Sequence, residues 1–526
     1  MEVSLDISKI TEAKRIRHVR LGAALVTLEE FVAVARFGAK VSFSQEYLEQ
    51  VTRSRQLAEK FLAENRKVYG LTTGFGDNVR KIIPQEQAVE LQVNILRSHS
   101  VSVGEPLKKE CVRAIWLMQL LSLGKGYSGI RPETLSLIAE CLNNDVTPYV
   151  PQDGSVQYLA IEGQINLILM GEGKAWHNGR LMSGAEALAE IGQKPWTPAP
   201  KEGLCLTNGA NAATGVSVLA LYDNLIAAQT ADVAAAMAFE AFRGTILACD
   251  ERLHSLKKHP EQANCAANIR AMLSDSAIMK KYIHAKVQDA YILRCIPQMH
   301  GASKRFIKDC AANILEEMAS CSDNPVLFPE DGDGTALMGA NFDSTFASGS
   351  ADILCMAAAN LAKFSERRTD RLTNRYLNQT YPAFLAERPG VDNCYMIVQY
   401  TAAALVGEIR SLSAPATADS VPTCANWEDP VSMGWWAARK SLMVAKKLHY
   451  VLGIELMAMT RAFDLLQKEE DGFASATKAV HDKIREVVPP VEKDRYFGPD
   501  IESTAALVSD GTIIKTAEEI AGTLAL

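Results

Sequence analysis

The sequence lacks the cysteine patterns, basic clusters and long apolar runs that mark several whole classes of protein. Its 11 cysteines are scattered singly, without a Cys-x-x-Cys pair, so we expect reduced thiols rather than a disulfide framework. The closest two histidines, His254 and His259, have a spacing that suits no metal-binding face of a helix. We therefore expect no metal site.

Charge and hydropathy exclude further partners. The net charge is -7 and no run of Lys or Arg stands out, so we expect no nucleic acid and no membrane partner. The first twenty residues contain no apolar core and no cleavage-site pattern, so we expect no signal peptide. The most apolar stretch is interrupted by Asp223, Asn224 and Asp232, which argues against a membrane span and for a cytoplasmic protein.

The chain is rich in helical periodicity instead. Its 48% hydrophobic and 22% charged content is that of a globular protein. Ala-, Leu-, Met- and Glu-rich segments with apolar residues three and four positions apart predict a mainly α fold, a bundle of long helices. The predicted helices include residues 108–124, 209–243, 308–320, 347–377, 395–412 and 433–468. Small residues on these helices permit close helix packing, and oligomerisation would cover their remaining apolar faces.

Gly and Pro divide the chain into three predicted parts. Residues 1–203 form an N-terminal mixed, mostly helical domain, with possible short strands around GKAWHNGRLM. Residues 204–470 form the central long-helix bundle, and residues 471–526 form a C-terminal helical tail.

Polar, Gly-rich loops between rigid helices are the expected places for catalytic groups. The loop at 69–78 places Tyr69 before three glycines, and its hydroxyl is a candidate catalytic group. A tyrosine at the start of a loop is also a common packing anchor, and Asn208, Arg294, Phe342 and Glu428 could equally be capping or core-polar residues.

Several of these irregular segments occur together in an informative order. They are VYGLTTGFG, LQVNILRSH, GSV, KEGLCLTNG, VQDAYILRC, SDNPVLF, GANF, SERRTDRLTN, ANWEDPVSM and KDRYFGPDI. In this order and spacing the chain resembles the histidine and aromatic amino-acid ammonia-lyase family, from residue 10 to residue 505.

The resemblance implies a homotetramer of nearly all-α subunits, with active sites where several subunits meet. Tyr69 matches the family tyrosine that removes the β-proton, and Tyr291 matches a residue that supports it by hydrogen bonding. Arg294 matches the expected partner of the substrate carboxylate, for which a guanidinium offers two parallel hydrogen bonds.

The same resemblance assigns further substrate-binding positions. Asn208 and Gln288 match residues that hold the substrate, and Phe342 matches a ring-packing position. In histidine-processing members, His99 matches a position that recognises the substrate side chain, and Glu428 matches a residue that faces the substrate ring or amine.

One departure from the family is large. Its members carry an Ala-Ser-Gly tripeptide after GSV that cyclises into methylidene-imidazolone, the electrophile of the reaction. Here the run is GSVQYLAIEGQINLILMGEG, three residues short, with Tyr158 and Gln164 at positions that are normally Asp and His. Ser155 is followed by Val156 and not by the glycine whose nitrogen closes the ring, so we expect no cofactor.

The missing tripeptide leads to a specific hypothesis about the substrate. A quaternary trimethylammonium group leaves without activation, and aromatic rings bind such a cation well. Tyr158 and Trp427 add rings near the expected site, although either could simply fill the vacated space. On this interpretation the chain resembles the cofactor-less ergothionase branch, and eliminates trimethylamine from a histidine-derived betaine such as ergothioneine to give thiolurocanate.

Two other interpretations stay open. One is an ammonia-lyase or aminomutase that acts on His, Tyr or Phe. The other is a catalytically inactive structural homologue.

Overall fold

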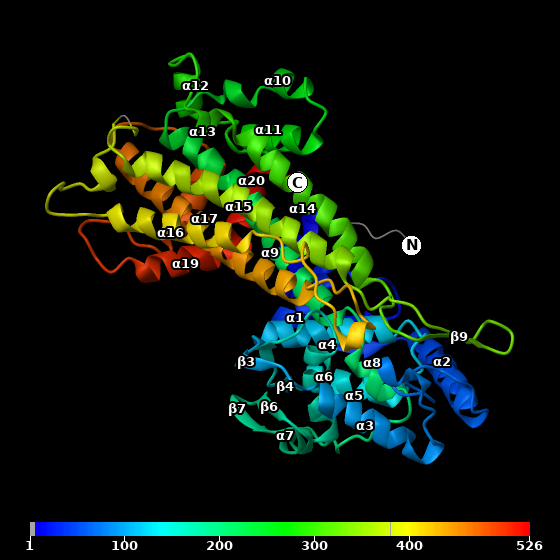
Figure 1. The fold of residues 1–526 in the computed structure, drawn as a ribbon. Coiled ribbons are helices and arrows are strands. Elements are labelled where there is room, and N and C mark those ends of the chain that lie inside the picture. The colour runs from blue at the N-terminus through cyan, green and yellow to red at the C-terminus, as the bar shows by residue number, and fades with distance from the viewer. Residues whose placement is uncertain (1–5, 379) are drawn as a thin grey trace.

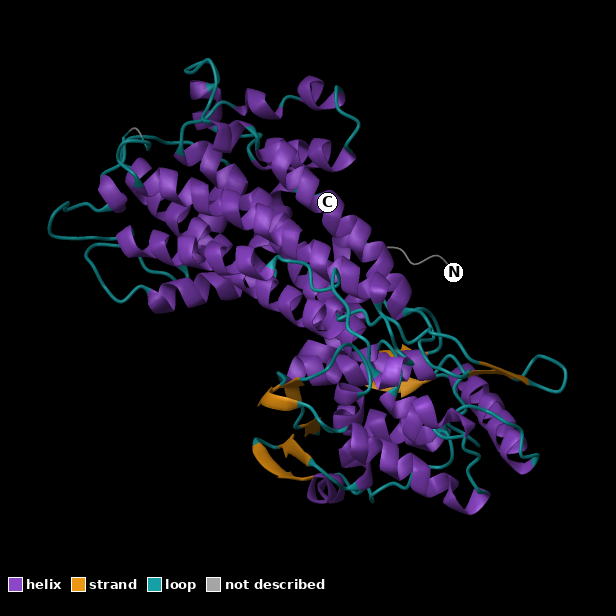
Figure 2. Cartoon of the chain, viewed as in Figure 1, coloured by secondary structure: helices purple, strands orange, loops and turns teal. Residues whose placement is uncertain are grey.

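The computed structural model describes residues 6–378 and 380–526, and these form a mainly helical molecule (Figure 1). Long, nearly aligned helices make up the bundle, and shorter helices surround its two ends. Figure 2 shows that most of the strands lie in the N-terminal part, beside the lower end of the bundle. The predicted mainly α fold is confirmed.

The N-terminal part combines short helices with small sheets. Its helices are α1 (Leu28–Phe37), α2 (Gln45–Ala63), α3 (Ala88–His99), α4 (Lys109–Leu123), α5 (Pro132–Asn143), α6 (Ala160–Asn166), α7 (Gly184–Glu190) and α8 (Glu202–Thr207). Its strands are β1 (His18–Leu21), β2 (Lys40–Phe43), β3 (Val103–Pro106), β4 (Thr147–Pro148), β5 (Pro151–Asp153), β6 (Lys174–His177) and β7 (Arg180–Ser183). The sheet orders are β1-β2, β3-β5 and β4-β6-β7, and only the first pair is parallel. The antiparallel β6-β7 pair confirms the strands predicted around GKAWHNGRLM.

The bundle and the elements around it follow. The helices are α9 (Asn211–Ala241), α10 (Glu251–Ser255), α11 (Pro260–Met272), α12 (Ala277–Tyr282), α13 (Tyr291–Arg294), α14 (Ile296–Met318), α15 (Thr345–Thr373), α16 (Met396–Leu412), α17 (Gly434–Leu466), α18 (Ser475–Arg485), α19 (Gly498–Ser509) and α20 (Thr512–Ala521). The antiparallel pair β8 (Val326–Phe328) and β9 (Thr335–Leu337) forms an arm beside α2. The long helices predicted from periodicity are all present.

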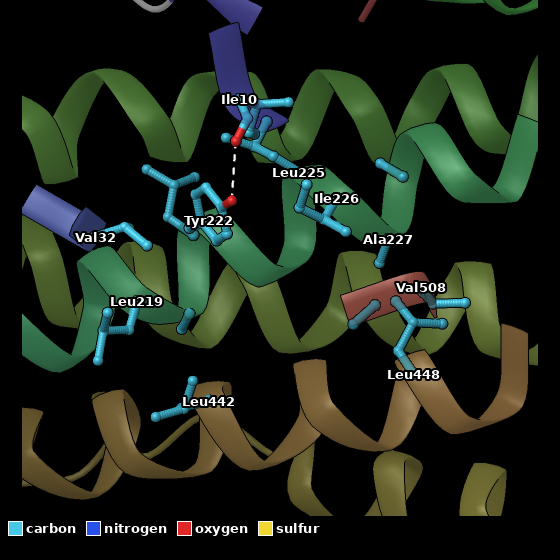
Figure 3. Close-up of a cluster of buried hydrophobic side chains, with 14 of the residues drawn as sticks. Ile10, Val32, Leu219, Tyr222, Leu225, Ile226, Ala227, Leu442, Leu448 and Val508 are labelled. Carbon is cyan, nitrogen blue, oxygen red and sulfur yellow. Dashed lines mark hydrogen bonds between the residues drawn. The ribbon is translucent and has the colours of Figure 1, made fainter. Parts of the chain in front are cut away.

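Helix α9 is the central element of the core. All 31 of its residues are buried, as expected for a helix that is apolar on every side. By length and composition residues 202–241 could cross a membrane, but the apolar stretch responsible is completely buried inside the protein. Figure 3 shows α9 residues packed between neighbouring elements, with the Tyr222 hydroxyl donating to the Ile10 carbonyl at 2.9 Å.

Glycines let the N-terminal part pack directly on neighbouring backbone. A Cβ at Gly215 of α9 would lie 2.9 Å from the Ala114 carbonyl oxygen of α4. A Cβ at Gly203 of α8 would lie 2.3 Å from the Gln92 carbonyl oxygen of α3. Backbone cannot yield as a flexible side chain can, so both helix pairs are fixed at their closest approach.

Several charged side chains inside the bundle form buried ion pairs. Arg368 of α15 donates through Nη2 to Glu455 Oε2 of α17 at 2.9 Å, and both side chains are fully buried. On α9, the Asp232 carboxylate accepts from Lys304 and His300 of α14, with 2.9 Å to His300 Nδ1. A buried ion pair contributes little over an apolar pair, but removing one partner leaves the other charge buried and alone.

The buried pair therefore gives a stability prediction. Arg368→Ala should lower the free energy of unfolding by about 3–5 kcal/mol, because Glu455 would remain buried without a cation. Arg305→Ala is the matched control, since the Arg305–Asp309 pair is more than half exposed on both sides and should cost at most about 0.5 kcal/mol. Denaturant titration followed by circular dichroism measures both variants. Equal losses would contradict the stated role of Arg368.

Candidate functional site

A large cavity lies where the N-terminal part meets two loops from the bundle. It has a volume of about 1240 Å³ and lies between the loop around Tyr69, helix α3, the end of α8 and the loops before α15 and α17. Of the ten predicted site residues, it is lined by Tyr69, His99, Asn208, Phe342, Trp427 and Glu428. Segments spread over most of the chain are thus brought together at one cavity.

Tyr69 lies on the loop that follows α2. Its hydroxyl oxygen accepts a hydrogen bond from the Gly76 N–H at 2.9 Å, and its ring meets Phe75 edge-on, with centroids 6.1 Å apart. Burial raises the pKa of Tyr69, the Gly76 N–H opposes that shift, and Cys424 and Glu428 add to it. An N–H aimed at the phenol oxygen stabilises the phenolate, which is the form a base requires.

The loop holds this geometry because Gly70 permits a tight fit. Gly70 has a φ of 66°, in the left-handed region, and a Cβ there would lie 2.4 Å from Leu204 Cδ2. Its carbonyl accepts from Gln92 Nε2 of α3 at 2.9 Å. Any side chain at Gly70 would push the Tyr69 peptide away from the pocket wall.

His99 is the last residue of α3 and faces the cavity. Its Nδ1 lies 3.0 Å from the Ser98 hydroxyl. Burial lowers the pKa of His99, so the ring is neutral at neutral pH. A neutral imidazole can both donate and accept a hydrogen bond, which suits recognition of a polar ring.

Asn208 ends helix α8 and links it to the loop before β8. Its side-chain amide donates to the Asn324 carbonyl at 2.9 Å. The neighbouring Lys201 and Asp323 form a fully buried ion pair at 3.0 Å, which fixes the same two segments to each other. Asn208 is thereby held at the cavity wall.

The loop between α16 and α17 supplies Trp427 and Glu428. Thr423 and Glu428 pair across it, with Thr423 N–H donating to the Glu428 carbonyl at 2.8 Å and the Thr423 hydroxyl donating to Glu428 Oε2 at 3.1 Å. The Trp427 indole N–H donates to Asp77 Oδ1 at 2.9 Å, so this loop contacts the Tyr69 loop directly.

Tyr158 and Gln157 fill the space behind Phe342. The Tyr158 ring is buried and meets Phe342 edge-on, with centroids 5.0 Å apart. Burial, followed by the nearby Glu428 charge, raises the pKa of Tyr158, so it stays a neutral phenol. Gln157 is fully buried, donates to the Phe342 carbonyl and accepts from the Ser432 hydroxyl at 2.8 Å.

Gln288, Tyr291 and Arg294 do not reach this cavity within one copy of the chain. They lie on and before α13, at the opposite end of the bundle (Figure 1). Asn208 lies just before the first residue of α9. Asp289 lies at the other end of this helix, where its carboxylate accepts from the Thr245 N–H just beyond the last residue of α9. A helix of 31 residues is about 45 Å long, so the two groups of residues are separated by that span.

Sequence reasoning missed several residues that shape the site. Asn324 lines the cavity within the SDNPVLF segment, and Asp77 follows directly after the GFG glycines, so both lay inside motifs already identified. Gln157 directly follows the GSV motif, but its partners Phe342 and Ser432 are far away in sequence, so the motif did not indicate its contacts.

One buried cluster elsewhere contains metal-ligand residue types. Potential ligand atoms of Asp232, Cys265 and His300 lie within 4.8 Å of one another. Lys304 already binds the Asp232 carboxylate, and the Arg368 guanidinium lies 3.3 Å from His300 Nε2. These side chains supply the positive charge that a metal ion would bring, so the cluster is better described as a structural network.

Comparisons with known proteins identify the family and the fold that this chain resembles. Residues 26–486 match the family model described as aromatic amino acid lyase. The histidine ammonia-lyase of Symbiobacterium thermophilum is 43% identical over 509 residues, covering 96% of this chain and 99% of the relative. The crystal structure of histidine ammonia-lyase from Trypanosoma cruzi is 34% identical with a TM-score of 0.89, covering 96% of this chain and 95% of that one. Ergothionase from Treponema denticola is 25% identical with a TM-score of 0.86, covering 94% of this chain and 99% of that one.

These comparisons overturn the substrate hypothesis drawn from the sequence. Relatives at the higher identity are histidine ammonia-lyases, whereas ergothionase is a more distant structural neighbour. Trimethylamine elimination from a betaine such as ergothioneine, and the ergothionase assignment, are therefore wrong. The two aromatic residues that motivated them have other contacts, since Trp427 bonds to Asp77 and Tyr158 packs on Phe342.

The residues present do not fit the methylidene-imidazolone of the resembling family. No Ala-Ser-Gly follows GSV, and Gln157 stands there with both ends of its amide hydrogen-bonded. Ser155 precedes Val156, whose nitrogen is not that of a glycine.

Glu162 is a buried carboxyl directly behind the cavity, on α6. Its Oε1 accepts from the Ala212 N–H at the start of α9 at 2.9 Å, and its Oε2 has no protein partner among the described residues. Burial raises the pKa of Glu162 from 4.5 to about 8. The folded protein therefore binds this proton more tightly than the unfolded chain does.

The sign of this shift gives a pH prediction. The unfolded carboxyl ionises near pH 4.5 and the folded one near pH 8, so wild-type stability should fall as the pH rises through that window. Glu162→Gln keeps an acceptor for the Ala212 N–H and cannot ionise, so at pH 8 it should be more stable than wild type by roughly 4 kcal/mol. Thermal unfolding at pH 5 and pH 8 measures this difference. An identical pH dependence in wild type and variant would rule the interpretation out.

Proposed function

Because the chain belongs to the aromatic amino acid lyase family, we propose that it is a carbon–nitrogen lyase that removes the amino group of histidine. The observation that carries this proposal is the gathering of Tyr69, His99, Asn208 and Glu428 around one cavity. The relatives named histidine ammonia-lyase support the choice of substrate.

The proposed step is a β-elimination. The Tyr69 phenolate takes a proton from the β-carbon, and the electrons of that C–H bond form the new carbon–carbon double bond. The bond from the α-carbon to nitrogen breaks, and the ammonium group departs as neutral ammonia. The products are a neutral Tyr69, ammonia and urocanate.

The cavity residues have distinct roles in this proposal. Glu428 accepts an N–H of the substrate imidazole, and His99 offers the ring a second polar contact. Asn208 contacts the carboxylate end. Phe342, Tyr158 and Trp427 shape the cavity around the ring.

Arg294 acts from a second copy of the chain. In one copy its guanidinium lies 4.9 Å from the ring of its own Tyr291, and its Nε is buried without a protein partner among the described residues. Tyr291 is 59% exposed. We assign the carboxylate to Arg294, with Gln288 and Tyr291 beside it, at a site completed where copies meet.

Exposed apolar side chains support an assembly, for which we propose a homotetramer. They occur on α15 and α16, which pack together, and include Phe346, Ile353, Met356, Ile397 and Tyr400. Water would be excluded from these side chains if further copies packed against them.

The base assignment is tested with histidine as substrate. Wild type should produce urocanate, visible by its near-ultraviolet absorbance, and Tyr69→Phe should lower kcat about 100-fold or more. Since burial raises the pKa of Tyr69, kcat of the wild type should rise with pH on the alkaline side. Tyr496→Phe, at a tyrosine that is 82% exposed, is the matched control.

Full turnover by Tyr69→Phe would contradict the base assignment. Turnover of tyrosine or phenylalanine but not histidine would contradict the substrate. Absence of turnover with all three would favour the catalytically inactive alternative.

Sharing of one site between copies is tested by mixing two inactive variants. Tyr69→Phe and Arg294→Ala subunits, co-expressed with different tags and purified through both, should regain about a quarter of the wild-type activity, because some sites receive Tyr69 and Arg294 from intact copies. Each variant alone should stay inactive. Mixed assemblies that remain as inactive as the separate variants would show that the two residues do not meet across copies.

A further inference from the structure

Two loops meet over the cavity and are joined there by a side-chain hydrogen bond. The Trp427 indole N–H from the loop before α17 donates to Asp77 Oδ1 on the loop after α2, at 2.9 Å. Beside it, a Cβ at Gly76 would lie 2.5 Å from Cys424 Sγ, so the two loops are in direct contact there. Asp77 is in the 3₁₀ helix η2 (Gly76–Arg80), and Cys424 is in η7 (Cys424–Asn426).

The loop that carries Trp427 is conformationally strained. Cys424, Ala425 and Asn426 have φ values of 49°, 54° and 66°, three consecutive non-glycine residues in the left-handed region. Only asparagine adopts that region readily, so the segment must be held by contacts on either side. The Thr423–Glu428 bridge joins the two ends of this segment, and the hydrogen bond to Asp77 holds the Trp427 side chain beside it.

This hydrogen bond acts next to the Tyr69 hydroxyl. Gly76, whose N–H donates to the Tyr69 oxygen at 2.9 Å, directly precedes Asp77 in the chain. Fixing Asp77 therefore fixes the peptide that orients and stabilises the Tyr69 oxygen. When Asp77 is released, the Gly76 N–H is free to move away from that oxygen.

We propose that the Trp427–Asp77 hydrogen bond is a latch that holds the Tyr69 loop closed over the cavity. Trp427 and Asp77 are then positioning residues, which act through Gly76 on Tyr69 and do not touch the reacting atoms. The proposal rests on the proposed function for the role of Tyr69 as base. The closure of the loop is measured separately from any activity.

The indole is well suited to this task. Its N–H is a donor only, and it faces a side-chain oxygen of Asp77 that accepts. Trp427 is 50% exposed, so the bond can open to water without unfolding the core.

Hydrogen exchange of the full-length protein without substrate tests the latch. Backbone amides of residues 70–80 should exchange about three- to tenfold faster in Trp427→Phe and in Asp77→Ala, because each variant removes one side of the bond. Asp77→Asn keeps an oxygen at the acceptor position and should stay close to wild type. Trp176→Phe, at a 40% exposed tryptophan on β6, is the matched control and should leave the loop unchanged.

Unchanged exchange in Trp427→Phe would overturn the latch, as would an Asp77→Asn variant that exchanges as fast as Asp77→Ala. If histidine is turned over, kcat should fall in Trp427→Phe and Asp77→Ala and recover in Asp77→Asn. A loss of kcat without faster exchange would also overturn the proposal. If no amino acid is turned over, the proposed function fails, whereas the exchange experiment still decides the latch.

Discussion

The rigid length of α9 is the constraint on which the rest of the structure depends. Every residue of this helix is buried, so it can neither bend into solvent nor shift without disturbing the core. It keeps the cavity residues at one end and the α13 residues at the other. A site that uses Tyr69 and Arg294 together must therefore take these residues from more than one copy of the chain. Such a site can form only when copies assemble.

Buried polar groups differ in how completely their hydrogen bonds are satisfied. Inside the bundle, Arg368 and Glu455 satisfy each other completely. Other buried polar atoms have no protein partner in the part of the chain described, among them Glu162 Oε2 on α6, Arg294 Nε on α13 and Gln229 Oε1 on α9. Incomplete satisfaction of this kind costs stability and is common where a protein binds ligands or other copies.

Much of the fold could be predicted from the sequence, because long periodic helices and the β6-β7 hairpin depend on local patterns. The residues around the cavity followed from motifs in a fixed order, through resemblance. The Trp427–Asp77 bond could not be predicted, since its partners lie in two motifs 350 positions apart and no local pattern indicates that the two side chains meet. The substrate hypothesis failed because a missing tripeptide shows what the chain has lost locally, but does not show which group departs. The three-part division, the tetramer and the cytoplasmic location stay predictions.

The close helix contacts at Gly203 and Gly215 have a consequence for how small molecules enter. The Gly203 contact fixes α8 on α3 within the N-terminal part, and the Gly215 contact fixes α4 of that part on α9 of the bundle, so the N-terminal part has little room to rotate on the bundle about a hinge. Motion that changes the size of the cavity is then confined mainly to the loops that carry Tyr69 and Trp427, while the helices that line the cavity stay fixed. In such a chain, substitutions of a few loop residues can change how fast small molecules enter and leave the cavity without changing the helices around it.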